Sequence, residues 1–387
     1  MSDLPKHIPI AKPLIDEREA DAAKRPIMSG WVTQGPEVAA FETEFAEFVG
    51  AEYACAVSSC TTALHLALLA VGVKPNDEVI TVSHSFIATA NVIRYCGATP
   101  VFVDIEPETY NMNPGLIERS ITSKTRTILC VHQMGMPCDM SSIIEIARRH
   151  DLLVVEDAAC AIGSEILWRG VWEKIGKPHG DVACFSFHPR KVITTGDGGM
   201  VTTKRRDLDS KFRLFRQHAM SVPDTVRHGA SQVIFESYPE LGYNYRMTDI
   251  QAAVGREQLK RLPHIVERRR ALASRYRELL AGINGLGLPE EPEWAQSNWQ
   301  SYCVRLPAKN DQRAVMQTML DSGVSTRRGI MCSHREEAYK DFGLRQPLTQ
   351  SELAQDHCIL LPLYPQMTEK EQEHVVQVLI EACRSHD

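Results

Sequence analysis

The stretch DEVITVSHSFIATANVIRYCGATPVFVDI, residues 77–105, holds two short apolar runs with a helix-like segment between them. DEVITVS (77–83) and TPVFVDI (99–105) predict strands. SFIATANVIRYCG (85–97) has helical spacing and ends at a glycine, so it predicts the connecting helix. A strand, a helix and a second strand in this order predict a βαβ unit, whose strands are parallel and buried.

The same alternation continues on both sides of this unit. Further strands are predicted at 125–133, 151–159, 180–187 and 198–203, and further helices at 60–72 and 141–150. We therefore expect an α/β fold whose large domain has three α/β/α layers around a mostly parallel sheet. Ligands of such sheets gather at the carboxyl ends of the strands, so functional residues are sought there.

The pattern changes after about residue 250. Residues 250–283 predict one or two long helices, interrupted at Pro263. A smaller α/β region follows, with predicted elements at 300–307, 313–324 and 368–383. A chain of 387 residues is long enough for two domains. We predict a large domain over 1–250 and a connecting helix with a small domain over 251–387.

Composition narrows the class of protein. The formal net charge of −6 argues against binding to nucleic acid or to an anionic membrane. The sequence holds no apolar run of the length that spans a membrane, and its opening lacks the apolar core of a secretory signal, so we expect a cytoplasmic protein. The 11 cysteines contain no C-x-x-C pair, which favours free thiols over disulfides or a metal site.

Two residues suggest chemistry. Asp157 ends the predicted strand 151–159, where a carboxylate needs a cationic partner such as a protonated ring nitrogen or a metal, unless it caps a following helix. Lys191 follows the predicted strand 180–187, where partial burial would make its amine a nucleophile, although a surface lysine is the simpler interpretation.

One cofactor uses both groups. Pyridoxal 5′-phosphate takes a lysine for its covalent link and a carboxylate for its ring nitrogen. The helix start VSSCTTALHLAL (57–68) offers backbone N–H groups and small hydroxyl residues to a phosphate, and Ser186 adds another hydroxyl. Phe86 is a candidate to stack on the ring, with burial in the core as its alternative.

Taken in order along nearly the whole chain, these segments resemble the DegT/DnrJ/EryC1/StrS family of sugar aminotransferases, which are fold-type I pyridoxal-phosphate enzymes. The segments are MSGWVTQGPEVAAFETEFAEFVG (28–50), SSCTTALHLAL (58–68), SFIATANVI (85–93), FVDI (102–105), VVEDAACAIGSE (154–165), FSFHPRKVITTGDGGMVTT (185–203), LGYNYRMTDIQAA (241–253) and LPLYPQMTEKEQ (361–372).

The resemblance implies a role for each matching residue. Lys191 would form the covalent link to the cofactor, Asp157 would pair with its ring nitrogen, and Phe86 would stack on the ring. The residues implied for the phosphate are Thr61, Thr62, Ser186 and, from the neighbouring subunit, Asn244. A homodimer with shared active sites is therefore expected. The implied reaction moves an amino group from glutamate to a keto-sugar, which in this family is commonly a nucleotide-linked 4-keto-6-deoxyhexose or a 3-keto sugar.

Substrate contacts are less defined. His188 and His334 fall where family members approach the sugar or its diphosphate, and Arg246 and His218 are further candidates for substrate or interface contacts. Arg327 and Arg328 would suit a phosphate or the glutamate carboxylate. A purely structural role is the alternative for each of these side chains.

The chain departs from the family pattern in three places. Cys60 replaces the glycine of the phosphate loop, so the backbone there must avoid positive φ. Cys160 replaces the Gln or His near the cofactor's phenolic oxygen, as a weak hydrogen-bond partner or as a spacer. The loop before the lysine strand, residues 167–180, is longer than usual.

Three other activities are alternatives to the aminotransferase. A sugar dehydratase of the same fold would carry histidine at position 191, and a catalytically silent accessory protein of a glycosyltransferase would not need both Lys191 and Asp157. An enzyme that acts on amino acids alone, such as a desulfurase, is the last alternative. The two retained residues favour the aminotransferase.

Overall fold

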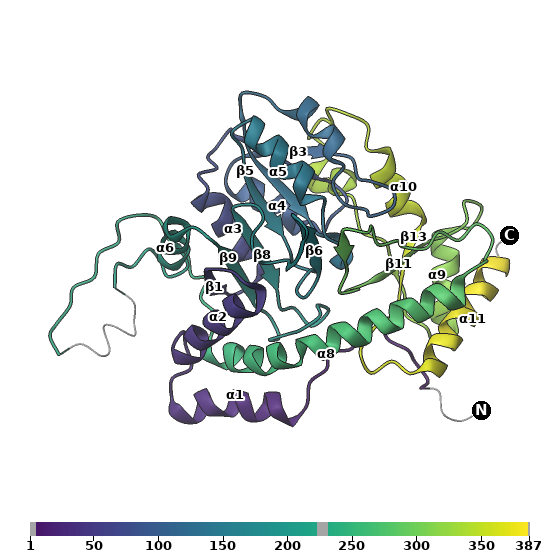
Figure 1. The fold of residues 1–387 in the computed structure, drawn as a ribbon, viewed down its shortest axis with the longest axis horizontal. Helices are drawn as coiled ribbons and strands as arrows, with labels where there is room; N and C mark the ends of the chain where they lie inside the picture. The colour runs from purple at the N-terminus through teal and green to yellow at the C-terminus, as the bar shows by residue number, and fades with distance from the viewer. Residues whose placement is uncertain (1–4, 223–230, 386–387) are drawn as a thin grey trace.

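The computed structural model describes residues 5–222 and 231–385, and a seven-stranded sheet lies at its centre (Figure 1). The strand order is β1-β9-β8-β5-β4-β2-β3. The strands are β1 (Tyr53–Val57), β2 (Glu78–Val82), β3 (Thr99–Val103), β4 (Thr125–Val131), β5 (Leu153–Asp157), β8 (Val182–Ser186) and β9 (Gly199–Thr203). β9 is antiparallel to both of its neighbours, and the other pairings are parallel. The expected mostly parallel sheet is confirmed.

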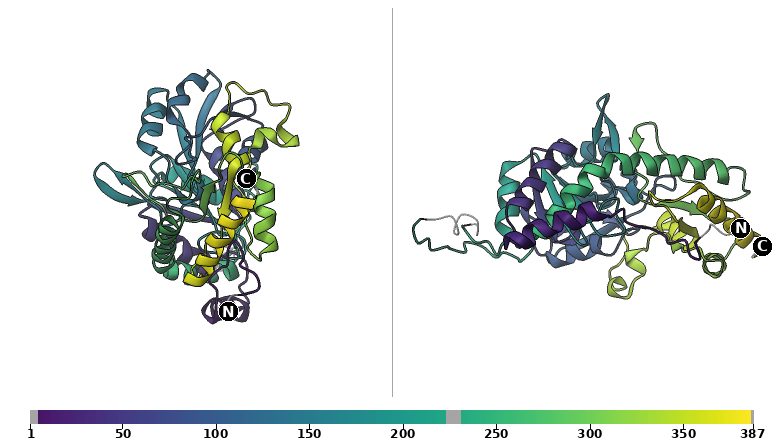
Figure 2. Two further views of the ribbon diagram at one scale, coloured as in Figure 1. Left: turned by 90° about the vertical axis from the view of Figure 1, so that its right-hand side faces the viewer. Right: turned by 90° about the horizontal axis from the view of Figure 1, so that it is seen from below.

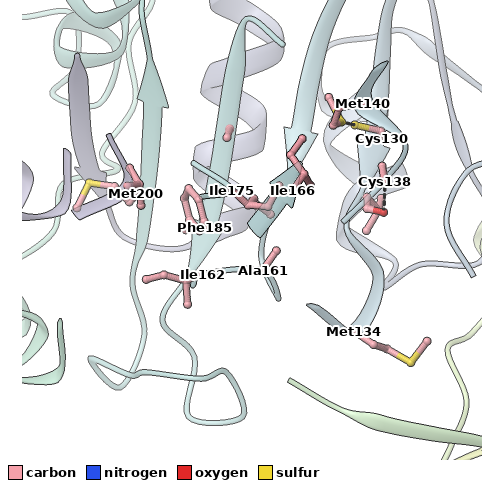
Figure 3. Packing of buried hydrophobic residues seen from close by; sticks show 14 of the residues in the cluster. Cys130, Met134, Cys138, Met140, Ala161, Ile162, Ile166, Ile175, Phe185 and Met200 are labelled. Atoms are coloured by element: carbon pink, nitrogen blue, oxygen red, sulfur yellow. Dashed lines mark hydrogen bonds between the residues drawn. The ribbon is translucent and has the colours of Figure 1, made fainter. Parts of the chain in front are cut away.

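Helices cover both faces of this sheet. Alternate residues of each strand point to opposite faces, so Val155 of β5 packs in one hydrophobic cluster and Val154 in another. The cluster around Val155 includes α3 (Cys60–Ala70), α4 (Ala88–Tyr95) and α6 (Arg206–Phe215). The cluster around Val154 includes α2 (Pro36–Val49), α5 (Met140–Arg149) and α8 (Asp249–Leu280). Figure 3 shows this second cluster near Phe185, with Met200 on one side and Ile175 on the other. The three α/β/α layers are confirmed.

The six strands predicted from the sequence are all present, with ends displaced by no more than two residues. Two early helices were not predicted. α1 (Glu17–Ser29) begins with a capping box at Asp16 and Glu19, and α2 ends at Gly50 in the left-handed conformation. Both pack against α8.

The predicted interruption at Pro263 is wrong. α8 runs through this residue as one helix of 32 residues from Asp249 to Leu280. A proline removes one backbone hydrogen bond, but the packing of α1 and α2 against the first half of α8 and of α11 (Glu369–Ser385) against the rest holds the helix together. Figure 1 shows α8 running continuously between the two parts of the molecule.

The long segment 167–180 is not a loop throughout. It contributes most of a hairpin, in which β6 (Glu165–Trp168) pairs with β7 (Val171–Lys174). Arg169 and Gly170 connect them with φ of 51° and 83°, as a type I′ turn requires. The short strand β10 (Ala295–Gln296) extends this sheet beside β6.

A smaller region completes the chain. Its antiparallel sheet has the order β11-β13-β12, and it packs with three helices. These elements are β11 (Tyr302–Arg305), α9 (Gln312–Asp321), β12 (Arg327–Arg328), α10 (Thr349–His357), β13 (Cys358–Leu361) and α11. Short 3₁₀ turns lie at Pro114–Leu116, Glu118–Ser120, Gln133–Gly135, Ser333–Arg335 and Glu337–Tyr339.

This region has a hydrophobic core of its own, in which Tyr276 of α8 meets Tyr302 of β11. Ile8 joins the same core through a bridge to Val324, although it comes from the start of the chain. The first and the last described residues accordingly lie toward the same end of the molecule (Figure 2). The boundary at residue 250 stays a prediction. Within 5–222 and 231–385, no helix combines the length and the apolar character needed to cross a membrane.

Candidate active site

A cavity of about 710 Å³ lies at the carboxyl end of the main sheet. The last residues of three parallel strands line it, Val131 of β4, Asp157 of β5 and Ser186 of β8. The other walls come from the N-terminus of α3 and from segment 326–331 around β12. The cavity therefore lies where ligands of parallel sheets bind, between two parts of the chain that are distant in sequence.

Asp157 presents a buried carboxylate to this cavity. It is 5% exposed, and its Oδ2 accepts a hydrogen bond from Thr89 Oγ1 at 2.8 Å. Its Oδ1 accepts from the backbone N–H of Ala159 at 3.2 Å, within a turn, so Asp157 caps no helix. Burial raises the pKa of Asp157, and the two hydrogen bonds and the amine of Lys191 offset this only in part. A cation placed at the carboxylate would stabilise its ionised form.

Lys191 reaches the same cavity from the turn that follows β8. Its backbone N–H donates to the carbonyl of His188 at 2.8 Å, and its amine donates to Cys160 Sγ at 3.0 Å. Burial disfavours the charged amine, but the contact with the Cys160 sulfur and the Asp157 carboxylate favour it. The pKa of Lys191 consequently lies above its usual value.

The N-terminus of α3 forms another wall of the cavity. Ser59 caps the helix, and its Oγ accepts from the N–H of Thr62 at 3.2 Å, while Thr62 Oγ1 accepts from the N–H of Ser59 at 3.1 Å. Thr62 is thus used by the cap and does not line the cavity. Thr61 lines it, and its hydroxyl makes no hydrogen bond to another described residue. A side chain at Gly199 of β9 would come within 2.5 Å of the Ser59 carbonyl, so glycine permits this close approach.

Phe86, Ser186 and His188 also line the cavity. Phe86 is 63% exposed and is therefore not a core phenylalanine. The Ser186 hydroxyl accepts a long hydrogen bond of 3.4 Å from the N–H of His188. His188 Nδ1 accepts from the N–H of Arg190 at 3.2 Å. Stacking by Phe86 and phosphate binding by Ser186 stay predictions.

Besides Thr62, three further predicted site residues lie outside this cavity. Asn244 is exposed, Arg246 is half-buried and bridges to Val57, and neither lines the cavity. His334 is engaged elsewhere, because Ser83 Oγ lies 2.7 Å from its Nδ1 and Glu352 Oε1 lies 3.0 Å from its Nε2. These contacts join the small region to the end of β2.

The cavity mouth is rich in guanidinium groups. Arg327 and Arg328 of β12 line it, as predicted candidates for phosphate or carboxylate, together with Arg190. Arg328 lies 3.5 Å from Glu336, whereas Arg327 forms no ion pair with another described residue. His218 lies outside the cavity with an exposed side chain.

Several lining residues were not found from the sequence. They are Ser59, Ser85, Thr89, Gln133, Arg190 and Gln300. Thr89 follows Ser85 by four residues, and their hydroxyl oxygens lie 2.8 Å apart. No local pattern marks Gln300, because only the folding of the small region brings it to the cavity.

The sequence model of the DegT/DnrJ/EryC1/StrS aminotransferase family matches residues 13–380. The chain belongs to this family. As a member of the DegT/DnrJ/EryC1/StrS aminotransferases it is an enzyme of amino-group transfer, and the recognition made from ordered sequence segments is confirmed.

Curated relatives match over most of their length. The aminotransferase is 43% identical over 308 residues to GDP-perosamine synthase of Caulobacter vibrioides. This alignment covers 79% of each chain. It is 36% identical over 386 residues to the spore coat polysaccharide biosynthesis protein SpsC of Bacillus subtilis. This alignment covers 98% of each chain.

Solved structures show the same fold. The Streptococcus pneumoniae protein Spr1654 has been solved in a PMP-form and in a PLP-form, both 26% identical to this aminotransferase, with TM-scores of 0.91 and 0.90. Each alignment covers 98% of this chain and 100% of the other.

Proposed function

We propose that this aminotransferase binds pyridoxal 5′-phosphate and transfers the amino group of glutamate to a keto-sugar. The proposed acceptor is a nucleotide-linked 4-keto-6-deoxyhexose or a 3-keto sugar, and the proposed setting is cytoplasmic synthesis of amino sugars for cell-surface polysaccharides or secondary metabolites. The names of GDP-perosamine synthase and SpsC among the relatives support sugar chemistry and polysaccharide synthesis.

The observation that carries the proposal is the pair of Asp157 and Lys191 in one cavity. A buried carboxylate at the end of β5 and a partly buried amine from the turn after β8 reach it together, because β5 pairs with β8. The carboxylate has hydroxyl and N–H donors but no ion-pair partner within 4 Å among the described residues. A protonated ring nitrogen is a partner of the right charge for it.

The other lining residues fit the same cofactor. The N-terminus of α3, the Thr61 hydroxyl and the Ser186 hydroxyl offer donors for a phosphate, and Phe86 offers an exposed aromatic face. When bound, pyridoxal phosphate supplies an electron sink that stabilises negative charge at the substrate carbon. Thr62 supports this site indirectly by fixing the cap of α3.

The protein's own groups then divide the work. Lys191 would hold the cofactor through its amine, and this amine, once free, would take a proton from the α-carbon of the donor and would deliver one to the carbon of the acceptor in the second half of the reaction. Asp157 keeps the ring nitrogen charged, and Thr89 fixes the carboxylate that does so. Arg190, Arg327 and the neighbouring Arg328 suit the carboxylates of glutamate and the phosphates of a nucleotide.

We also propose that two copies assemble, with Asn244 of each reaching the phosphate of the other. Asn244 is exposed and lies outside its own cavity, as this assignment requires. The chain on both sides of 223–230 extends away from the sheet (Figure 1), and Val233, Phe235 and Leu241 there are 85%, 91% and 79% exposed. A second copy would cover this apolar surface.

A substrate panel tests the function. Purified protein with pyridoxal phosphate is given glutamate and, one at a time, nucleotide-linked 4-keto and 3-keto sugars, and release of 2-oxoglutarate is followed. We expect turnover with at least one keto-sugar and visible absorbance of the bound cofactor that bleaches with glutamate. In Lys191→Ala both signals should vanish while the circular dichroism stays that of the wild type.

Three results would contradict the proposal. Turnover by Lys191→Ala would remove the assigned role of the amine. A wild-type protein that binds no cofactor would be an accessory protein, and one that reacts only with amino acids would belong to another activity of the fold.

A further inference from the structure

The contact between Cys160 and Lys191 joins two segments of the active site. Cys160 lies in the turn after β5, and Lys191 lies in the turn after the neighbouring strand β8. The amine donates to the sulfur at 3.0 Å, and both residues line the cavity. Of the 11 cysteines, Cys160 alone is partly exposed and the other ten are buried.

The backbone on each side of this contact is held by one short segment. Asn298 Nδ2 donates to the carbonyl of Cys160 at 2.8 Å and to that of Ile162 at 2.8 Å. Gln300 Nε2 donates to the carbonyl of Arg190, the neighbour of Lys191, at 2.8 Å. Asn298 is completely buried, so its two bonds are shielded from water. The segment 298–300 thus fixes both turns. The contact between the Cys160 sulfur and the Lys191 amine is therefore supported by hydrogen bonds on both sides.

The charges around the Lys191 amine favour its protonated form. The groups that face it from other elements are Cys60 of α3, Asp157 of β5 and Cys160. Burial of Cys60 raises the pKa of its thiol well above the usual value, so this thiol stays neutral. Asp157 is held mainly by Thr89. Cys160 is therefore the acceptor in direct contact with the amine.

We propose that Cys160 is a positioning residue, which holds the free amine of Lys191 and increases its affinity for a proton. The inference deepens the proposed function, because the amine that Cys160 holds is the one assigned to proton transfer. A higher proton affinity keeps a larger fraction of the amine protonated, so more of it can donate a proton at the acceptor carbon and less of it is free to act as a base at the donor carbon. Cys160 would thus balance the two half-reactions.

The first test measures the protonation of the Lys191 amine in the absence of substrate. Full-length protein free of pyridoxal phosphate is acetylated briefly with acetic anhydride at pH 8.5, and labelling of each lysine is read by mass spectrometry. Lys24 and Lys124, which are exposed, serve as internal references. Acetic anhydride reacts with the neutral amine, so labelling of Lys191 relative to these references reports its protonation.

Three variants separate the effect of the sulfur atom from that of access to the amine. Cys160→Ser keeps the approximate size of the side chain and a hydrogen-bond acceptor but replaces the sulfur by oxygen. We expect Lys191 to be labelled about tenfold faster in Cys160→Ser and in Cys160→Ala, as a pKa lower by about one unit requires. Cys96→Ala removes a buried thiol at the end of α4 and should leave the labelling ratio unchanged.

The second test uses the loaded enzyme and its pH profile. A lower proton affinity of Lys191 should move the acidic limb of the kcat profile to lower pH in Cys160→Ser, since the base then stays neutral in more acidic solution. The loss of a merely structural contact would lower kcat without moving this limb.

Either of two results would overturn the proposal. Faster labelling in Cys160→Ala but not in Cys160→Ser would show that only access to the amine had changed. Equal labelling in all variants would show that Cys160 has no influence on Lys191. Because the labelling needs no substrate, a protein inactive on every keto-sugar would contradict the proposed function and leave this result standing.

Discussion

Asp157 and Lys191 are held in different ways, and this difference matters for their chemistry. Asp157 is part of a strand and is fixed by Thr89 and the backbone of Ala159. Lys191 lies in the turn after β8, and its side chain is held by the hydrogen bond from its amine to Cys160. The Asp157 carboxylate is fixed in position, whereas the Lys191 amine is at the end of a flexible side chain. This difference suits a site in which the carboxylate stabilises a charge and the amine transfers a proton.

Asp157→Asn should lower kcat by about a hundredfold or more, because a neutral amide no longer stabilises a positive charge on the ring nitrogen. The amide has nearly the shape of the carboxylate, so the fold should remain. Turnover with glutamate and the best keto-sugar measures the effect, and circular dichroism checks the fold. Thr89→Val, which removes the 2.8 Å hydrogen bond to the carboxylate, should cause a smaller loss in the same direction. Near-normal turnover by Asp157→Asn would contradict the role of the charge.

Sequence alone could locate Asp157 and Lys191, because both follow apolar runs that predict buried strands. It could not locate Asn298 and Gln300, whose contacts with the turns at Cys160 and Arg190 span more than a hundred residues. Local patterns carry no information on such contacts. Thr62 shows a different difficulty. Its hydroxyl lies in the segment predicted to bind phosphate, but it forms hydrogen bonds within the cap of its own helix.

At the scale of elements, side chains from distant segments complete the helix ends. The Asp249 carboxylate accepts from the N–H groups of Gly35, Glu37 and Val38 at 2.7, 3.2 and 3.0 Å, and thereby caps α2 from the first turn of α8. The Asp104 carboxylate, just after β3, accepts from the N–H groups at the start of α10 in the same manner. These caps attach helices to the sheet and to one another.

Asp249→Ala should lower the free energy of unfolding by about 2 kcal/mol, since it leaves three N–H groups at a partly buried helix start without their acceptor. Urea unfolding followed by circular dichroism measures the change. Asp311→Ala provides a comparison, because Asp311 caps α9 through one hydrogen bond, to the N–H of Ala314 at 2.7 Å. A loss for Asp249→Ala no greater than that for Asp311→Ala would show that the remote cap adds nothing to α2.

A buried ion cluster joins α2 and α6 to β1. Glu42 Oε1 accepts from the N–H of Ala56 at 2.9 Å, and its carboxylate pairs with Arg216 and with Arg213, the latter at 2.7 Å. Burial raises the pKa of Glu42, but the two arginines outweigh burial and hold it below its usual value. Glu42 therefore stabilises the fold above the pKa of an unfolded glutamate, and this contribution is lost as the pH falls through the lower folded-state pKa.

Arg216→Met should reduce the free energy of unfolding at pH 7 by about 3–5 kcal/mol, because Glu42 keeps its buried charge and loses a partner. The loss should shrink as the pH falls through the range in which the Glu42 carboxylate takes up a proton, because protonation removes the buried charge. Urea unfolding at a series of pH values tests both parts. A loss of equal size at all pH values would mean that packing, and not charge, is what Arg216 supplies.

The elements differ in how well the sequence predicts them. Six of the seven strands of the main sheet, all except β1, match the prediction within two residues at each end, because an apolar run bounded by polar residues identifies a buried strand. The hairpin at Arg169 and Gly170 was missed although an X-Gly pair between apolar runs is a known signal for its turn. The continuity of α8 through Pro263 could not be predicted, because tertiary packing decides it.

For the whole molecule, the proposed dimer makes each active site depend on two chains. Lys191→Ala and Asn244→Ala should each be inactive or strongly impaired as pure dimers. When the two variants are unfolded, mixed and refolded together, one site of each mixed dimer regains both residues. We expect the mixture to recover about a quarter of wild-type activity, which random pairing of equal amounts gives.

Refolding each variant alone under the same conditions is the control for this experiment, and light scattering confirms the dimer. Recovery no greater than the average of the two separate preparations would place Asn244 in the site of its own chain, or outside any site.

The position of β9 has a consequence for synthesis on the ribosome. β1 lies at the edge of the sheet, and its neighbour there is β9, which comes more than 140 residues later in the chain. Cys55 and Val57 are therefore translated long before the strand that covers their edge exists. Until residue 203 leaves the exit tunnel, the nascent chain presents an open strand edge to other chains, and pairing over so long a separation is slow. The nascent chain should thus need chaperones most in the middle of translation. This need should fall once β9 has been synthesised and pairs with β1.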